Sequence, residues 1–225
     1  YMAYAGERPV LSGGRQITNW EPYRDGIVRA RLPETRKGLW WFRQLFCDGQ
    51  RMIRARYPKY DHADPLYGGW AFVVKTVSEV PDAAGDAKVE APVAFRFEAG
   101  VFPKRWAKPQ QGEVFIIPGR GWISDIIPVK KVNDERHTIH LTRPVGPSRN
   151  NLGLATHIES GNRFYVENNI EDLTGPGQWC LDTDTGTVYL WPPDGDVESA
   201  EVTAPATVRL IQMIGTRRSP VSHVT

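Results

Sequence analysis

Short stretches of alternating apolar and polar residues recur along the chain, and a two-residue period is typical of β-strands. Between residues 39 and 52 this alternation is interrupted at the pair Asp48-Gly49. Both central positions of a type I′ turn need positive φ, so Asp-Gly between strand-like segments predicts a tight hairpin. Further strands are predicted at residues 8–20, as a pair around Gly13-Gly14, and at residues 70–80, 93–97, 114–117, 121–129 and 138–142.

One segment has a helical period instead. Val166, Ile170 and Leu173 lie at i, i+4 and i+7, which predicts a short amphipathic helix ending before residues 175–177, Gly-Pro-Gly. Near the C-terminal end, residues 207–214 and 220–225 read as two short strands. Their spacing fits either a hairpin or successive sides of a solenoid coil.

Residues 178–181 and 187–191 are predicted to form a hairpin around a turn at residues 182–186. Tyr189 and Trp191 are two residues apart and so share one face of their strand. Trp179 lies on the partner strand, within reach of a cross-strand contact. We predict that these three aromatic side chains form a structural cluster rather than a sugar-stacking platform.

Composition supports an all-β fold. The 225 residues include 21 Gly and 18 Pro, which interrupt nearly every helix-length window and exclude a helix bundle. The 8 Trp, 8 Tyr and 8 Phe residues favour strands. Hydrophobic residues make up 40% and charged residues 24%, an ordinary globular composition. No apolar run approaches the roughly 20 residues that span a bilayer, so we expect no membrane insertion.

Charge is distributed unevenly along the chain. Residues 1–60 hold 12 Lys and Arg against 5 Asp and Glu, a net charge of +7, whereas residues 61–225 hold 16 against 21, a net charge of −5. A basic N-terminal quarter is suited to an anionic polymer, either nucleic acid or acidic polysaccharide. The alternative is that these arginines form ordinary surface contacts and salt bridges.

Motifs for phosphate and metal chemistry are absent. The sequence has no GxxxxGK[ST] loop, no GxGxxG after a strand and no HExxH. His137 and His140 would face opposite sides of a strand. Residues 182–186 resemble the start of a calcium loop, but Pro193 stands where an EF-hand needs its bidentate glutamate, so a hairpin turn is the better interpretation. We predict no metal site and no cofactor.

Nucleophilic chemistry has equally little support. Ser12 lacks the first glycine of a GxSxG motif. Cys47 and Cys180 are too few for a zinc site and form no CxxC pair, which leaves one disulfide or two thiols.

Carbohydrate chemistry would need carboxylates and flat aromatic faces. Glycosidases use two carboxylates, but the spacing of the candidates assigns no pair, so no catalytic residue is predicted. The candidates are Asp125, Glu159, Glu167, Glu171, Asp172, Asp182 and Asp184. Four tryptophans, which could instead fill the core, are candidate substrate-binding residues. They are Trp20, Trp70, Trp106 and Trp122.

Seven short segments, taken together, resemble a known protein family. They are GERPVLSGG (6–14), ITNW (17–20), RQLFCDGQR (43–51), RARYP (54–58), NRFYVEN (162–168), GPGQWCLD (175–182) and GTVYLWP (186–192). Together they resemble the N-terminal region of right-handed parallel β-helix glycoside hydrolases of the β-xylosidase and α-fucosidase kind, whose helix carries an inserted β-domain. The chain departs from the family pattern at Gln178, where Glu is usual, and at Cys180, where an aromatic residue is usual.

The resemblance implies an architecture. Residues 1–20 would be a β-helix stub, residues 21–205 an inserted antiparallel β-sandwich or barrel-like domain, and residues 206–225 the start of the continuing β-helix. The catalytic carboxylates of such enzymes are expected beyond residue 225. We therefore expect a non-catalytic portion of a secreted or periplasmic polysaccharide-degrading enzyme that buttresses the helix or forms a wall of its substrate cleft.

Two other functions stay open at this point. The chain could be a stand-alone carbohydrate-binding module that uses exposed tryptophans. It could also bind an anionic polymer through its basic N-terminal quarter, although no motif that reads DNA or RNA accompanies the charge, so we expect no nucleic-acid partner. The expected partner is an oligo- or polysaccharide, and the sequence does not define an oligomeric state.

Overall fold

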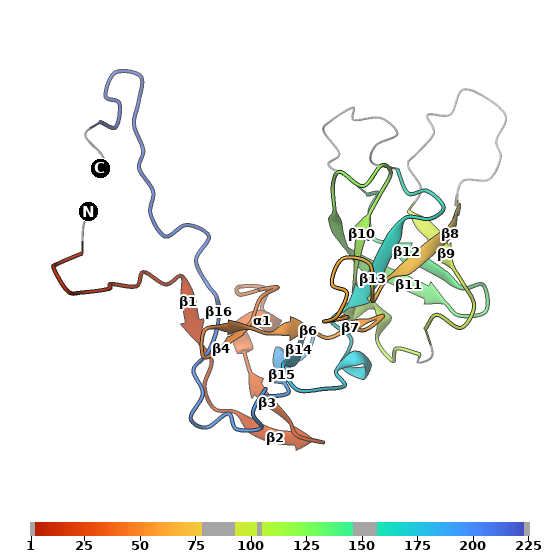
Figure 1. Ribbon diagram of the computed structural model, residues 1–225, viewed down its shortest axis with the longest axis horizontal. Coiled ribbons are helices and arrows are strands. Elements are labelled where there is room, and N and C mark those ends of the chain that lie inside the picture. The colour runs from red at the N-terminus through yellow and green to blue at the C-terminus, as the bar shows by residue number, and fades with distance from the viewer. Residues whose placement is uncertain (1–2, 78–92, 103–104, 146–156, 223–225) are drawn as a thin grey trace.

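The computed structural model describes residues 3–77, 93–102, 105–145 and 157–222, and strands dominate this part of the chain (Figure 1). Helical segments within it are short, namely α1 (Pro33–Arg36) and the 3-10 turns η1 (Pro109–Gln111) and η3 (Ile170–Asp172). In the described residues no helix has the length and apolar character needed to cross a bilayer. The prediction of an all-β protein is confirmed.

Six strands form a closed antiparallel barrel. They are β8 (Ala71–Val77), β9 (Ala94–Phe97), β10 (Glu113–Ile117), β11 (Asp125–Asn133), β12 (Thr138–Leu141) and β13 (Arg163–Glu167). Their order is β10-β11-β12-β9-β8-β13, and β13 pairs back with β10. Closure matters because it leaves no unpaired strand edge in the barrel. The short strand β7 (Arg56–Tyr57) pairs with one end of β13.

The barrel core follows from the two-residue period of its strands. On β10, Val114 and Ile116 point inward and are fully buried, while Phe115 points outward and stacks on Tyr165 of β13. The same inner layer holds aromatic and aliphatic side chains from every strand of the barrel. Its members include Ala71, Val73, Phe95, Phe97, Ile127, Val129, Ile139, Leu141, Phe164 and Val166.

The remaining strands form two sheets that share a second core, and we call this part the two-sheet unit. One sheet has the order β2-β3-β15-β14-β6 and the other β1-β16-β4-β5. The strands are β1 (Gly14–Gln16), β2 (Glu21–Arg24), β3 (Ile27–Arg31), β4 (Phe46–Cys47), β5 (Gln50–Arg51), β6 (Ile53–Arg54), β14 (Gln178–Asp182), β15 (Thr187–Leu190) and β16 (Val202–Pro205). Trp179 and Leu190 of the first sheet meet Val202 and Ala204 of the second in this core.

The chain passes between the two parts at β6–β7 and at β13–β14. Ala55, between β6 and β7, is fully buried and donates its N–H to the carbonyl of Trp179, while its own carbonyl accepts the N–H of Asn168. The connection between barrel and two-sheet unit is therefore hydrogen-bonded on both sides rather than a free linker.

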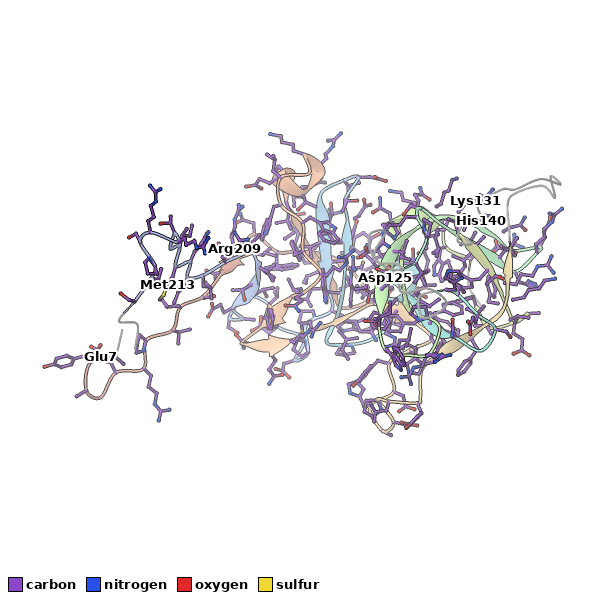
Figure 2. All side chains as sticks on the ribbon, turned by 90° about the horizontal axis from the view of Figure 1, so that it is seen from above. Glu7, Asp125, Lys131, His140, Arg209 and Met213 are labelled. Atoms are coloured by element: carbon purple, nitrogen blue, oxygen red, sulfur yellow. The ribbon has the colours of Figure 1, made fainter. Side chains whose placement is uncertain are left out.

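The two ends of the chain run side by side. β1 pairs with β16, and the carbonyl of Gly13 accepts the N–H groups of Ala206 and Thr207 at 2.8 and 3.2 Å. Beyond these strands the described residues extend away from the body as two arms (Figure 1). Figure 2 shows Glu7, Arg209 and Met213 on these arms, at the opposite end of the molecule from Lys131 and His140 of the barrel.

The strand predictions at both ends are wrong in part. Of the two strands predicted within residues 8–20, the structure has only β1, and this strand includes Gly14, which was expected in the turn. Residues 207–214 form no strand, and neither do residues 220–222; residues 223–225 lie outside the described part. These apolar residues have β-propensity, but a strand also needs a partner to pair with, and none of the described segments supplies one.

The helix predicted at residues 166–173 is also wrong. Val166 belongs to β13, the strand ends at Glu167, and Asn168 has a φ of +78°, after which only the turn η3 follows. Pairing of β13 with β10 and β7 places Val166 in the barrel core, and this tertiary pairing overrides the helical spacing of the apolar residues.

The predicted aromatic cluster is split between the two faces of its hairpin. Trp179 pairs with Leu190 and Cys180 pairs with Tyr189, so Trp179 and Tyr189 point to opposite faces. Trp179 stacks on Phe42, with ring centroids 5.5 Å apart, in the core of the two-sheet unit. Tyr189 and Trp191 pack on the other face, against Cys180. Both cysteines are buried free thiols.

The hairpin turns predicted at Asp48-Gly49 and at residues 182–186 are confirmed. Asp48 and Gly49 have φ values of +49° and +74° between β4 and β5. At the second turn, Asp182 Oδ1 accepts the N–H groups of Asp184 and Thr185. The Asp182 carboxylate thus stabilises the turn between β14 and β15.

We expect Gly49→Val to lower the free energy of unfolding by about 1 kcal/mol or more, because a β-branched residue is strained at positive φ. A Cβ at Gly49 meets no atom within 4 Å, so the cost is conformational rather than steric. Gly175→Val is the matched control, since its Cβ is equally unobstructed and its φ is not positive. Equal urea midpoints for the two variants would contradict this account.

Candidate functional site

A buried ionic cluster lies where the barrel meets the two-sheet unit. Glu113 on β10 and Glu167 on β13 are direct cross-strand partners at one rim of the barrel. Both carboxylates bind the same nitrogen, Nη1 of Arg54 on β6, and the Glu167 contact measures 3.0 Å. All three side chains are buried. One arginine of the two-sheet unit thereby forms ion pairs with two carboxylates of the barrel.

Arg43 joins the cluster from the side facing solvent. Its guanidinium binds Glu113 through two nitrogens, Nε at 3.0 Å and Nη2 at 2.5 Å. This bidentate geometry is the strong form of an arginine–carboxylate pair. The same guanidinium stacks over Trp41, 4.1 Å from the centre of the indole ring. Glu113 therefore holds Arg43, and Arg43 in turn packs on Trp41.

Asn168 connects the cluster to the backbone on both sides. Its Oδ1 accepts the Leu181 N–H at 2.8 Å and the Arg54 Nε–H at 3.2 Å. Its Nδ2 donates to the carbonyls of Gln111 at 2.7 Å and Leu181 at 2.9 Å. The side chain thus links β14 to the segment that precedes β10, which explains why a positive φ is tolerated at this buried asparagine.

The environment shifts the pKa values of Glu113 and Glu167 in opposite directions. Burial opposes the charge of Glu113, but hydrogen bonds from Arg43 and the charge of Arg54 outweigh it and hold the pKa of Glu113 below its ordinary value. Burial dominates at Glu167 and raises its pKa, with Arg54 opposing the shift. Glu113 therefore stabilises the fold above its unfolded pKa and loses this contribution in acid. Glu167 favours the fold at low pH instead.

The cluster does not have the form of a hydrolytic site. Retaining glycosidases hold two carboxylates about 5 to 5.5 Å apart with the sugar between them. Here the guanidinium of Arg54 occupies the space between Glu113 and Glu167 and binds both. Because both carboxylates are buried, a sugar ring cannot take its place without breaking the junction. The cluster is a structural clasp.

A groove of about 540 Å³ lies over the solvent side of this clasp. Its lining includes Trp41, Arg43 and Glu113, and also Thr35, Gln110, Gln111 and Thr183. Trp41 is 47% exposed, so the indole offers an apolar face beside polar side chains. Thr35 is buried, and its Oγ1 has no hydrogen-bond partner among the described residues. An aromatic face next to several amides and hydroxyls suits a polyhydroxylated ligand.

The four predicted tryptophans occupy separate places. Trp20 packs partly buried on the core of the two-sheet unit and donates to the Ile17 carbonyl at 3.1 Å. Trp106 is a buried member of the barrel core, where its Nε1–H donates to Asp172 at 2.8 Å. A sugar therefore has no access to the Trp106 ring, and the expectation for this residue is corrected.

The other two tryptophans lie on the outside of the barrel. Trp70 packs against Tyr165 and lies under the guanidinium of Arg163, 4.9 Å from the ring centre. Trp122 is 75% exposed in the connection between β10 and β11. Neither lines the groove, whose tryptophan is Trp41.

The candidate carboxylates have mostly structural partners. Glu167 belongs to the clasp, Asp125 binds Arg143 through both oxygens at 2.7 Å, and Asp182 binds Lys108 at 3.2 Å. Glu113 was not among the sequence candidates. The position of Glu113 directly before the apolar run Val114–Ile117 distinguishes it in the sequence. That position does not identify Arg54, 59 residues away, as its partner.

Two comparisons, with family models and with curated proteins, gave no match for this chain. Among solved structures, one titled "Glycoside hydrolase" is similar, with a TM-score of 0.64 at 23% sequence identity. The likeness covers 97% of this chain and 35% of that one, so the chain spans about a third of its structural neighbour. The protein therefore has a glycoside hydrolase-like all-β fold built on a six-stranded antiparallel barrel.

We expect Arg54→Met to lower the free energy of unfolding by about 3–5 kcal/mol at neutral pH, because it leaves Glu113 and Glu167 buried without their shared countercharge. The loss should shrink as the pH falls below the ordinary glutamate range, since protonated carboxyls need no countercharge. Urea denaturation over a pH series measures both effects.

Arg143→Met is the control for Arg54→Met. It breaks a bidentate pair with Asp125, but Arg143 is half-exposed, so the expected cost is below about 1 kcal/mol. Similar losses for the two variants, or a loss at Arg54 that does not depend on pH, would contradict the clasp.

Proposed function

We propose that this chain is a non-catalytic part of a carbohydrate-active protein of the glycoside hydrolase type. In this proposal it is a β-domain inserted between coils of a right-handed parallel β-helix, with boundaries near residues 20 and 205. The observation that carries the proposal is the match of nearly the whole chain to about a third of a glycoside hydrolase. A chain that corresponds to one third of an enzyme need not contain its catalytic centre.

The terminal arms support a buttressing role. Apolar side chains crowd along both arms and are strongly exposed. They are Val10, Leu11, Val208, Leu210, Ile211 and Ile214. A groove of about 640 Å³ runs between the arms and is lined by several of them. Exposed apolar patches of this kind mark interaction surfaces. Stacked β-helix coils would cover them, because a single coil cannot bury its own faces.

The clasp supports the same role from the other side. It fixes the barrel to the two-sheet unit through buried ion pairs, so the barrel is held at a set position relative to the arms. A barrel held in this way can form one wall of a substrate cleft beside the helix. A loosely tethered barrel could not keep that position.

We expect no glycosidase activity from the chain alone, because Arg54 occupies the space between the buried carboxylates of Glu113 and Glu167 and binds both. A panel of aryl-glycosides incubated with the purified chain should release no more aryl alcohol than a heat-denatured control. Turnover clearly above that control would show a complete active site and would overturn the non-catalytic assignment.

A second candidate function, a carbohydrate-binding module, is favoured by the groove at Trp41. If the groove binds glycan, Trp41→Ala should abolish retardation of the chain in native gels that contain soluble xylan or β-glucan, since a stacking ring contributes much of such binding. Trp122→Ala is the matched control, because Trp122 is the more exposed indole and lies outside the groove. Equal retardation of both variants would exclude the groove as the binding site.

The third function, binding of an anionic polymer, has little support from the basic N-terminal quarter. Arg15 pairs with Glu34, Arg43 and Arg54 pair with Glu113, and Arg29 lies 3.5 Å from Glu21. These four arginines are engaged with carboxylates within the protein, which lowers the positive charge that residues 1–60 can offer to a polyanion.

A further inference from the structure

An arginine stacked on a tryptophan lies on the outer face of the barrel. Arg163 of β13 has its guanidinium 4.9 Å from the ring centre of Trp70, and its Nη1–H donates to the Leu66 carbonyl at 2.8 Å in an exposed hydrogen bond. The stacked ring restricts the plane of the guanidinium, and the hydrogen bond restricts its direction. Arg163 is therefore a cation held in one orientation at the surface.

The remaining nitrogens of this guanidinium are open. Nε and Nη2 of Arg163 have no hydrogen-bond partner among the described residues, and neither atom is enclosed by the protein, so both N–H groups can reach a ligand. The acidic residues of the loop that contains Leu66 are used within that loop. Asp61 Oδ1 accepts the N–H of Ala63 at 2.9 Å, and Asp64 Oδ1 accepts that of Tyr67 at 3.0 Å.

Arg43 shows what such an arginine binds in this same protein. It stacks on Trp41, 4.1 Å from the ring centre, and holds the Glu113 carboxylate through Nε and Nη2. The N–H groups of these two nitrogens point in parallel from one edge of the guanidinium and match the two oxygens of a carboxylate. Arg163 presents the same edge, also stacked on a tryptophan. A carboxylate ligand would complete it.

Apolar surface lies beside the open edge. Phe72 on β8 and Ile117 on β10 are the cross-strand partners of Arg163, so all three side chains lie on the outer face of the barrel. Phe72 is 53% exposed, and Tyr67, next to Leu66 in the chain, is 76% exposed. A ligand that carries a carboxylate on an apolar body can therefore bind the cation and cover Phe72 together.

The sheet selects among ligands of this kind. β8 is paired on both sides, with β9 and β13, and β13 is paired with β8 and β10, so neither strand offers a free edge to the backbone of an acidic peptide. A small inorganic anion would leave the aromatic surface uncovered. A uronate fits both features, because its carboxylate is fixed to a sugar ring whose C–H face packs on an aromatic side chain.

We propose that Arg163 and Phe72 bind a uronate unit, either free or as part of an acidic glycan. The proposal rests on the proposed function for its ligand class, and it assigns a site on the outer face of the barrel, separate from the groove at Trp41. The carboxylate would accept from Nε and Nη2 of Arg163, the ring would pack on Phe72, and the hydroxyls would stay hydrated.

The test compares methyl β-D-glucuronoside with methyl β-D-glucoside, which differ only in a carboxylate that replaces a hydroxymethyl group. Each is titrated into the purified chain at constant ionic strength and followed by ligand-observed NMR, with sodium acetate as the carboxylate without a ring. We expect saturable binding of the glucuronoside, and binding about tenfold weaker or more for the glucoside and for acetate. Repeating the titrations with Trp41→Ala removes any contribution of the groove.

Four variants assign the binding to its residues. Arg163→Met should remove the preference for the glucuronoside, and Arg163→Lys should restore little of it, because an ammonium keeps the charge without the two parallel N–H groups. Phe72→Ala should weaken binding of the glucuronoside without changing that of acetate. Arg217→Met, at an exposed arginine of the C-terminal arm, should change neither. Thermal melting verifies that each variant is folded.

Three outcomes would overturn the proposal. They are the absence of saturable glucuronoside binding, acetate binding as tight as that of the glucuronoside, and a preference that survives Arg163→Met in folded protein. An acetylated and amidated aspartate dipeptide that binds more tightly than the glucuronoside would assign the surface to a peptide instead. The hydrolysis assay does not depend on Arg163, so it reads the proposed function separately.

Discussion

The junction between barrel and two-sheet unit depends on one buried guanidinium. Arg54 binds Glu113 and Glu167, which lie opposite each other on β10 and β13. The Nε–H of Arg54 donates to Oδ1 of Asn168. Transfer of these charges from water to the interior costs free energy, and only full pairing offsets that desolvation cost. The arrangement therefore tolerates little relative movement: a shift that separated Arg54 from the rim would leave Glu167 buried without its countercharge and Glu113 with Arg43 alone. The two cores are separate, but this clasp joins them.

The position of both cavities follows from this clasp. Gln111 and Asn168 belong to the lining of each, so the groove at Trp41 and a smaller cavity lined by Tyr23 and Tyr189 lie on either side of the same hydrogen-bonded pair. Trp41 is oriented through Arg43, whose guanidinium is fixed by Glu113. Side chains held in this way are preorganised, because their positions are fixed before any ligand arrives. A buttressing domain and a sugar-contacting domain need the same rigidity.

Local features of this fold could be predicted from the sequence, whereas features set by distant pairing could not. Asp48-Gly49 and the turn after Asp182 are confirmed because a few neighbouring residues determine them. The helix predicted around Val166 is wrong because β13 pairs with β10, about fifty residues earlier in the chain. The sequence predicts one cluster for Trp179 and Tyr189 because it does not reveal the strand register that separates them. Arg54 reads as one more basic residue until the fold brings Glu113 and Glu167 to it.

The pairing of Arg54 with carboxylates also bears on which kind of partner the basic N-terminal quarter could bind. The sequence gives residues 1–60 a net charge of +7, which by itself favours an anionic polymer. In the fold, Arg43 and Arg54 form ion pairs with Glu113 in the clasp. Arg56 is buried, with its guanidinium 3.5 Å from the ring centre of Tyr165. Affinity for a polyanion depends on cations that can replace its counterions at an accessible surface. Arginines committed to buried carboxylates and aromatic rings cannot do this, so Arg43, Arg54 and Arg56 contribute less to affinity for a polyanion than the net charge of residues 1–60 suggests.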